Sequence, residues 1–400
     1  MERDQAVFSF DPTGRRLHED NAHLLSAGPA VRVSLPGGVT AWSVTRLHLL
    51  RQLAADDRLS RDARQHWPGL SEVPEDWPLA PFLLSPTVLN AYGSDHRRLR
   101  DVMEDAFTEE HMAHMRAGLE RRVPARLATL GDPGSGTVVD IRSAYAEPIA
   151  SETLCDLFGV PPEDWPAGRQ AMADLLQPSA DPDTAAAQLG SAMGFLSRLI
   201  AAKRDDPGDD MATTLLRSPD MTEEERVLAL AVTIAGGVPA TTGLITNAVL
   251  HLLQDPKQLA LVASHEASWP AVIEETLRHD APVQHMPLRY AVDDIDVGDG
   301  IVIRRGEPVV LGFGAGGRDR AVHGDTAETF DIRRTNTEHV AFGHGVHRCV
   351  GAPLGRLEAS VALPALFEHF PGIAPAEPAD TLAPLPTFVF SGKAALPVRL

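Results

Sequence analysis

One uninterrupted helical pattern, from Thr222 to the pair Asp255-Pro256, limits most strongly what this chain can fold into. Thr222 is followed by three glutamates, which fits the capping box that opens a helix. At about 1.5 Å per residue, such a helix is about 50 Å long and crosses a whole domain. Its Leu, Ala, Val and Ile residues lie on several faces, which predicts burial along much of its length. A large, mainly helical protein is needed to surround it.

The remaining patterns are mostly helical, with a few short strands. Residues 31–35 and 39–44, separated by Pro36-Gly37-Gly38, predict a β-hairpin. Strands are expected at 289–292 and 301–303, with Asp299-Gly300 as their turn, and a hairpin around 388–390. Further helices are expected at 45–55, 95–107, 110–130, 143–158, 162–176, 184–203 and 353–370. A Pro-rich stretch at 67–86 is long for a structureless loop, and such loops are often functional.

These patterns predict a mainly α fold, with a large helical domain and small β-sheets. We expect one domain over residues 1–400, with a minor β-rich part at about 28–60 and 282–310. The hydrophobic fraction of 44% is that of a globular protein with a sizeable core.

Charge and cysteine content narrow the partners and the compartment. Lys and Arg number 36 against 55 Asp and Glu, which gives a net charge of −19. This charge repels phosphates and anionic lipids, so neither nucleic acid nor a membrane is expected as a partner. Two cysteines are too few for a disulfide framework, and residues 1–5 lack the apolar region of a signal peptide. We therefore expect a cytoplasmic protein.

The segment from Phe342 to Gly351, which reads FGHGVHRCVG, carries the chemistry. Its three glycines before and after Cys349 let the backbone approach a large flat ligand and adopt left-handed turns. Pro353 suits the first turn of the next helix, so Cys349 lies just before a helix N-terminus. The helix dipole and the free N–H groups there favour a thiolate over a thiol.

Several roles are open to Cys349. A zinc cluster with His344 and His347 lacks a paired C-x2-C motif and an evident fourth ligand. A Cys–His nucleophile lacks an obvious orienting Asn or Asp, and an unreactive loop cysteine is the remaining alternative. The loop taken with the helix that follows makes axial ligation of haem iron the best interpretation. A thiolate axial ligand pushes electron density onto haem iron and favours O–O cleavage. Cys155, by contrast, is expected to be a packed helix residue.

The loop resembles the haem signature of the cytochrome P450 family, Phe-Gly-x-Gly-x-His-x-Cys-x-Gly, and matches every fixed position. Three further segments match in the family's order, so the resemblance covers nearly the whole chain, and it is to the soluble bacterial, actinomycete-type branch. It implies a cytochrome P450 fold and a monooxygenase, an oxidoreductase of secondary metabolism. It also implies haem b (iron protoporphyrin IX), with Cys349 as the metal ligand and Phe342, Gly343 and Gly351 around the cofactor.

The resemblance assigns further roles to charged residues. The pair His96 and Arg100, which alone suggests an exposed basic patch, would bind the haem propionates together with Arg289 and His347. Glu275 and Arg278 lie at i, i+3, a spacing that usually marks a solvated surface pair. In the family such a pair is buried, and Arg334 would join it to brace the haem loop. A surface with Arg64, Arg97 and Arg348 would dock an acidic ferredoxin, supplied by a ferredoxin reductase.

The resemblance breaks at the centre of the long helix. The family has Ala/Gly-Gly-x-Asp/Glu-Thr there, an acid followed by an alcohol. Counted back without gaps from Asp255-Pro256, the acid is replaced by Pro239 and the alcohol by Ala240. A shift of one residue puts Ala240 and Thr241 in those places and still leaves no acid. Pro239, Ala240 and Thr241 are the expected catalytic segment, and Pro239 should open the helix near the carbonyl of Ala235.

This break matters because dioxygen cleavage needs protons delivered by an organised group. Thr241 with ordered water, or a substrate hydroxyl, can replace the pair. Oxidation of a hydrophobic small molecule with O2 and ferredoxin-supplied electrons is the first expectation. The alternative is a haem-thiolate enzyme without normal O2 activation, driven by peroxide or catalysing a non-oxidative cyclisation or isomerisation. A haem-binding sensor or carrier is a third class.

The substrate pocket is expected, by family position, to be mostly apolar. Its candidate lining residues are Leu83, Leu84, Val88, Val238, Val283, Met286, Phe388 and Val389. Such a lining suits a natural product or a steroid-like molecule, although each residue alone is more typical of an ordinary core. For His285, a hydrogen bond in the pocket and a packing role are both open.

Overall fold

The computed structural model describes residues 7–74, 77 and 79–400, and it confirms a mainly helical protein with small sheets. The longer helices are α1 (Leu17–Ala27), α2 (Leu47–Ala54), α5 (Gly93–Glu104), α6 (Glu109–Leu127), α7 (Glu147–Phe158), α8 (Trp165–Leu176), α9 (Pro182–Ala202), α10 (Met211–Arg217), α11 (Glu223–Gln254), α12 (Pro256–Ala263), α13 (Trp269–His279) and α16 (Ala352–His369). Four short ones are α3 (Ala63–His66), α4 (Ala80–Leu84), α14 (Phe313–Gly316) and α15 (Arg320–His323).

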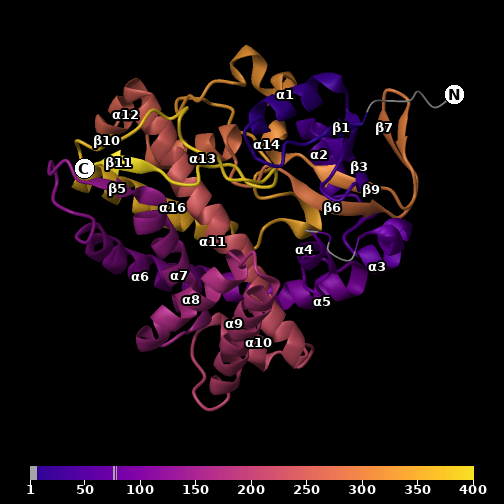
Figure 1. Cartoon of the computed structure of the whole chain (residues 1–400), viewed down its shortest axis with the longest axis horizontal. Coiled ribbons are helices and arrows are strands. Elements are labelled where there is room, and N and C mark those ends of the chain that lie inside the picture. Colours follow the sequence, from indigo (N-terminus) through magenta and orange to yellow (C-terminus); the bar gives the residue numbers. More distant parts are fainter. Residues whose placement is uncertain (1–6, 75–76, 78) are drawn as a thin grey trace.

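Helix α11 crosses the molecule diagonally, as Figure 1 shows. The predicted capping box is present: the Thr222 side chain accepts from the Glu225 N–H, and the Glu225 carboxylate accepts from the Thr222 N–H. The helix packs against α7, α9, α13 and α16, and it continues through Pro239 without ending. It is long and apolar enough to cross a membrane, but here its apolar faces pack against these neighbours. The sequence therefore predicted the element that organises the core.

A six-stranded sheet unites two segments far apart in the chain. Its order is β1 (Phe8–Ser9), β2 (Ala30–Ser34), β3 (Thr40–Val44), β9 (Pro308–Leu311), β6 (Met286–Ala291) and β4 (Leu59–Ser60). The predicted hairpin is β2–β3, paired antiparallel with Arg32 opposite Trp42. β3 runs parallel to β9, which pairs antiparallel with β6. The sheet thus joins the two parts that the sequence groups as β-rich.

The turn at Asp299-Gly300 joins a different pair of strands from the one predicted. It connects β7 (Ile295–Gly298) to β8 (Ile301–Ile303), and both turn residues have positive φ. β6 instead pairs with β9 and β4, because the short β7–β8 hairpin is an insertion between β6 and β9. A third sheet is formed by β5 (Val138–Asp140), β11 (Pro397–Arg399) and β10 (Ala374–Pro375).

The Pro-rich stretch at 67–86 is more ordered than predicted. A 3₁₀ helix (Pro68–Glu72) and α4 lie within it, while residues 75, 76 and 78 lie outside the described residues. Trp77 is buried, donates its indole N–H to the Pro36 carbonyl at 2.7 Å, and lies 5.6 Å from the Trp67 ring. Two buried tryptophans anchor this stretch, a tertiary effect that local prolines do not reveal.

The main core lies between α6, α7, α11 and α16. Tyr145 donates its hydroxyl to the Ala362 carbonyl at 2.6 Å and joins the start of α7 to α16. Cys155 on α7 is fully buried, as predicted, and burial raises the pKa of its thiol to about 12. It is therefore an unreactive packing residue.

Candidate active site

A cavity of about 270 Å³ lies between α11 and the loop that carries Cys349. The loop contributes Phe342, Gly343, His347, Cys349 and Gly351, the complete set expected around the cofactor. On the opposite side α11 contributes residues from Val232 to Leu244. The cavity thus has a sulfur on one face and a long apolar helix on the other, with room for a flat ligand between them.

The backbone of the Cys349 loop is folded back on itself. The Cys349 N–H donates to the Phe342 carbonyl at 2.8 Å, and Gly343 and Gly345 both have a φ of 70°. A Cβ at Gly345 would lie 2.4 Å from the Ala54 carbonyl oxygen, so a larger residue would separate the loop from α2. Helix α16 starts three residues after Cys349, with Pro353 in its first turn as predicted.

The Cys349 side chain faces the cavity, where it is exposed, and is enclosed by protein on its other sides. This enclosure raises the pKa of the thiol, although the Gly351 N–H and the charges of Arg100 and Arg348 favour the thiolate. In the protein alone, desolvation raises the pKa of Cys349 by more than the favourable groups near the helix N-terminus lower it. A metal cation bound to the sulfur would reverse this balance, because a coordinating thiol is deprotonated outright.

The four residues expected at the propionates lie together at one side of the cavity. The rings of His96 and His347 are 4.1 Å apart, and Arg289 is almost completely buried. Burial first, and then neighbouring arginines, lower the pKa of His96 to about 4, and the pKa of His347 is lowered in the same way. Arg100 donates to Glu104 at 2.6 Å and to the Arg348 carbonyl at 2.5 Å.

Arg61 joins this group, and the sequence analysis missed it. It lies directly after β4, lines the cavity and is only 1% exposed. Neither Arg61 nor Arg289 has a carboxylate within 4.0 Å among the described residues, and the Nε atoms of both are unpaired. A buried cationic group of this kind requires an anionic ligand. Haem b, with two propionates, fits this requirement.

The α11 face of the cavity contains two of the three expected catalytic residues. Ala240 and Thr241 line the cavity, whereas Pro239 does not. The Thr241 hydroxyl donates to Glu358 Oε2 at 2.9 Å. Glu358, on α16, is 3% exposed and also lines the cavity. Burial raises the pKa of Glu358 to about 8, so the carboxyl group is mostly protonated at neutral pH.

Glu358 is a second functional residue that the sequence analysis missed. Its signal was present, because it occupies the buried stripe of α16 between Leu354 and Ala362, one turn from each. A glutamate in an apolar stripe requires a polar partner. Its partner, Thr241, is 117 residues away in the chain, so the pair is visible only in the folded protein.

Half of the residues expected to line the substrate pocket do line the cavity. Val88, Val283, Met286 and Val389 line the cavity, together with Phe82 and Phe390. Leu83, Leu84, Val238 and Phe388 do not line it.

The reason is side-chain direction within each element. Phe388 stacks on Phe10 at 5.0 Å in the neighbouring core, whereas the next two residues, Val389 and Phe390, line the cavity. Val238 lies on the face of α11 that packs into the main core. Leu83 is buried in the cluster beneath the six-stranded sheet, and Leu84 packs against that cluster.

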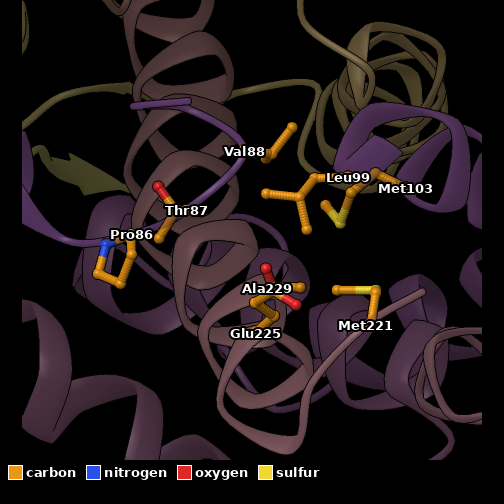
Figure 2. Close-up of a pocket in the computed structure, with 8 residues that line it drawn as sticks. All are labelled: Pro86, Thr87, Val88, Leu99, Met103, Met221, Glu225 and Ala229. Atoms are coloured by element: carbon orange, nitrogen blue, oxygen red, sulfur yellow. The ribbon is translucent and has the colours of Figure 1, made fainter. Parts of the chain in front are cut away.

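A second, smaller cavity has a volume of about 10 Å³, large enough for one water molecule, and Figure 2 shows the residues that line it. Its walls are Pro86, Thr87, Val88, Leu99, Met103, Met221, Glu225 and Ala229. Val88 and Met103 line both cavities and separate them.

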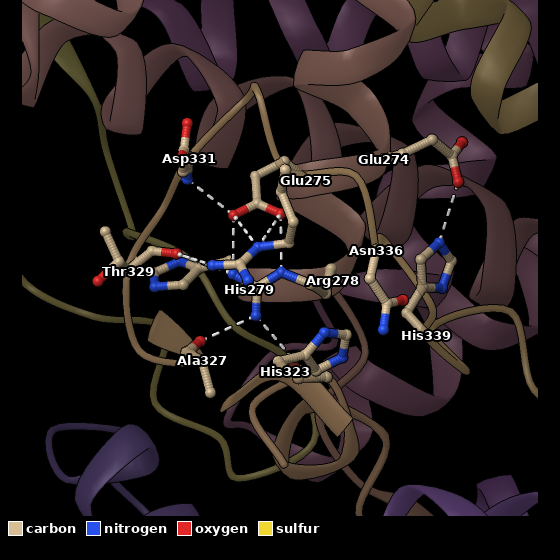
Figure 3. Close-up of polar contacts among 12 residues, drawn as sticks. Glu274, Glu275, Arg278, His279, His323, Ala327, Thr329, Asp331, Asn336 and His339 are labelled. Carbon is tan, nitrogen blue, oxygen red and sulfur yellow. Dashed lines mark hydrogen bonds and ion pairs between the residues drawn. The ribbon is translucent and has the colours of Figure 1, made fainter. Parts of the chain in front are cut away.

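Glu275 and Arg278 form a buried bidentate ion pair, with both N···O distances at 2.7 Å (Figure 3). Arg334 approaches Glu275 at 3.3 Å and donates to the Thr326 carbonyl at 2.6 Å. Arg278 also donates to the carbonyls of Gly317, Ala327 and Thr329. The structure therefore brings the three residues together as one network, away from the cavity lining.

Within the described part of the chain, no group of three or more His, Cys, Asp and Glu side chains is placed to hold a metal ion. The zinc cluster of His344, His347 and Cys349 therefore has no support in the geometry.

Comparisons with a family model, with curated proteins and with solved structures all find similar proteins. A family model described as Cytochrome P450 matches residues 269–389. The 2-hydroxy-5-methyl-1-naphthoate 7-hydroxylase of Streptomyces carzinostaticus is 36% identical over 98% of this chain and 97% of its own length. The vitamin D(3) 25-hydroxylase of Pseudonocardia autotrophica is 33% identical over 96% and 93%. The solved structure of CYP154A1 from Streptomyces coelicolor A3(2) has a TM-score of 0.90 and 41% identity, covering 98% of this chain and 99% of that one.

Proposed function

This chain belongs to the cytochrome P450 family, and from that membership we propose that it hydroxylates, or otherwise oxidises, a hydrophobic natural product or steroid-like molecule with O2 and ferredoxin-supplied electrons. The predicted P450 fold and the monooxygenase activity are confirmed by the relatives. The substrate class, haem b and the redox partner are the proposal.

The observation that carries the proposal is the apolar cavity with Cys349 on one face and the Thr241–Glu358 pair on the other. Haem b bound by Cys349 supplies the iron at which dioxygen is activated. His96, Arg100, Arg289 and His347 would hold its propionates, because charge-assisted donors suit carboxylates. Glu275, Arg278 and Arg334 would keep the chain ahead of the loop in place.

The lining supports a substrate with a large apolar framework. Val88, Val283, Met286, Val389 and other apolar side chains surround the space next to α11. The arginines and histidines of the cavity gather instead at the propionate side. Two relatives act on an aromatic acid and on vitamin D(3), as their names state, and both substrates have large apolar carbon frameworks.

For proton delivery, we propose that Thr241 and Glu358 replace the acid–alcohol pair that Pro239 and Ala240 lack. A protonated carboxyl group with a pKa of about 8 is a suitable general acid near neutral pH. Glu358 would pass its proton to the Thr241 hydroxyl, or to a water molecule beside it, and the hydroxyl would present a proton to the cavity. The carboxylate left behind would regain a proton from solvent through buried water.

An acidic ferredoxin, reduced by a ferredoxin reductase, is the proposed electron donor. Arg64, Arg97 and Arg348 are exposed, as a docking surface requires. Arg348 is also the neighbour of Cys349, so a partner bound there would lie near the ligand loop. We propose a cytoplasmic location, which is supported by the burial of the long apolar helix α11 among other helices.

A second candidate function rests on Pro239 and Ala240. If the Thr241–Glu358 pair is not a relay, the enzyme would use peroxide or catalyse a non-oxidative cyclisation or isomerisation. The first experiment is product formation from a panel of apolar substrates, with and without reduced ferredoxin in air. Oxygen incorporation that depends on electrons supports the monooxygenase. Product formed without electrons or dioxygen would replace it with the second candidate.

The relay is tested with Glu358→Gln, which can still bond Thr241 but has no acidic proton. We expect product per reducing equivalent to fall about 100-fold, the lower end for loss of a general acid. In the unaltered enzyme this yield should decline above pH 8, as Glu358 ionises. A complementary variant is Ala240→Thr, which restores an alcohol at the family position and should raise this yield if the missing alcohol limits proton delivery. An unchanged yield in Glu358→Gln, with the haem spectrum intact, would contradict the relay.

A further inference from the structure

Arg61 is a buried guanidinium whose contacts do not account for its charge. Its Nη2 atom lies 3.5 Å from Asn90 Oδ1 and 3.3 Å from the Pro287 carbonyl, both long contacts. Its Nε atom has no partner. Arg278 is also fully buried, but its guanidinium is fully paired: it forms a bidentate ion pair with Glu275 and donates to three carbonyl groups.

The neighbouring carboxylate, Asp62, is not a counter-ion for Arg61. Asp62, the next residue, caps α3: its two carboxylate oxygens accept from the Gln65 backbone N–H at 3.0 Å and from the Gln65 amide at 2.7 Å. Within residues 7–74, 77 and 79–400, no carboxylate lies within 4.0 Å of Arg61. A cation buried in this way costs several kcal/mol unless a ligand compensates it.

Arg61 and Arg289 share one electrostatic environment. Burial, followed by the charge of Arg61, lowers the pKa of Arg289 to about 9, and burial lowers that of Arg61 to about 10. Both arginines thus remain charged at neutral pH. Arg100 already has Glu104 as its partner. The propionate side of the cavity therefore has two positive charges without a counter-ion.

We propose that Arg61 is a fifth propionate-binding residue and that, with Arg289, it neutralises the two carboxylates of haem b. This inference rests on the cofactor of the proposed function, but not on the reaction or the substrate. The number of uncompensated buried charges equals the number of propionates. A substrate carboxylate is the competing ligand for Arg61, but Arg289, His96 and His347 gather on the same side of the cavity.

The test compares Arg61→Gln, Arg61→Lys and the unaltered enzyme, all isolated with haem bound. The first measurement is the rate of haem transfer to apomyoglobin. We expect Arg61→Gln to lose haem about 10-fold to 100-fold faster, the cost of removing a charge-assisted hydrogen bond. Arg61→Lys keeps the charge and should lie near the unaltered enzyme. Arg121→Gln, an exposed arginine on α6, is the control for general loss of charge.

Two further readouts separate propionate binding from a merely structural role. The haem reduction potential should fall in Arg61→Gln, because a nearby cation favours the reduced, more negative form. The resonance Raman band of propionate bending should also shift in Arg61→Gln and return in Arg61→Lys. If Arg61→Gln binds no haem whereas Arg61→Lys does, that difference also supports the proposal.

Unchanged haem loss and potential in Arg61→Gln would overturn the proposal. If only the binding of carboxylate-bearing substrates weakened, Arg61 would belong to substrate recognition instead. Equal haem loss in Arg61→Lys and Arg61→Gln would show that the shape of the side chain matters rather than its charge, and would also overturn it. None of these measurements requires product formation. A failure of the proposed oxygenase activity can therefore be distinguished from a failure of Arg61 to bind a propionate.

Discussion

At the scale of single residues, His285 is a buried histidine without a polar partner. It is fully buried, neither ring nitrogen is hydrogen-bonded, and its ring lies 4.6 Å from that of Phe10. It does not line the cavity, so of the two roles open from the sequence, packing is the one that the structure shows. Burial lowers the pKa of His285 to about 3.

We therefore predict that His285→Leu stabilises the protein. Removing two unsatisfied nitrogens should raise the free energy of unfolding by about 1–3 kcal/mol. Because its pKa is depressed in the folded state, His285 binds a proton more readily when unfolded, and the native protein loses stability as the pH falls from about 6.5 to about 3. His285→Leu should flatten this dependence in urea titrations. The exposed His48→Leu serves as control, and an equal gain there would contradict the argument.

Cys349 gives the second prediction at this scale. Cys349→Ala should abolish the thiolate-type carbon monoxide spectrum of the reduced protein, because it removes the sulfur that faces the cavity. Cys155→Ala, at the only other cysteine, should leave the spectrum intact because its thiol is enclosed in α7 packing. A normal spectrum in Cys349→Ala would refute the ligand assignment.

At the scale of elements, α11 agrees with the sequence prediction and has a proline, Pro239, inside it. The sequence predicts its start, its length and its burial, and the structure confirms them. Pro239 lies inside the helix, which continues through it to Gln254 and packs against α7 and α16. Proline removes one N–H, so the carbonyl of Ala235 lacks its usual helical partner, and Ala235 lines the cavity.

Pro239→Ala should consequently stabilise α11, by up to about 3 kcal/mol from the restored hydrogen bond. If water at the freed carbonyl helps to deliver protons, product per reducing equivalent should fall in the same variant. Pro364→Ala, at a proline inside α16, is the matched control. A gain in melting temperature in both variants, with a changed yield in Pro239→Ala alone, is the expected pattern. A yield that stays constant would exclude the water at Ala235.

At the scale of the whole molecule, Asp280 connects segments that are distant in the chain. Its carboxylate accepts from Ser391 at 2.5 Å, lies 3.0 Å from His251 Nε2 and 3.5 Å from His18 Nε2. These partners come from α1, α11 and the C-terminal turn whose Val389 and Phe390 line the cavity. Burial alone would raise the pKa of Asp280, but the charges of His18, His251 and Arg318 lower it overall.

Asp280→Asn is expected to lower the free energy of unfolding at neutral pH by about 1.5–3 kcal/mol, the value of hydrogen bonds to a charged group. Because the carboxyl pKa is lower in the folded state, this stabilisation is present above the unfolded pKa of about 3.9 and is lost as the pH falls below it. The difference between variant and unaltered protein should therefore shrink at acidic pH in urea titrations. A constant difference from pH 7 to pH 3 would assign the effect to packing.

The sequence by itself determined the elements and the ligand loop. Helix α11, the β2–β3 hairpin and the segment from Phe342 to Gly351 follow from local signals: a capping box, a glycine turn and a helix start. These signals act over a few residues, so the chain displays them before it folds. The resemblance then assigned the propionate donors and the Glu275 network, which the structure brings together.

The tertiary structure alone decided which side chains share the cavity and which charges lack partners. Thr241 meets Glu358 across 117 residues, and Arg61 reaches the propionate side through the pairing of β4 with β6. Leu83, Val238 and Phe388 face other cores because side-chain direction depends on packing between elements. Burial itself, which lowers the pKa of His96 and raises that of Glu358, exists only once distant segments exclude water. Local sequence patterns therefore do not predict where water is excluded.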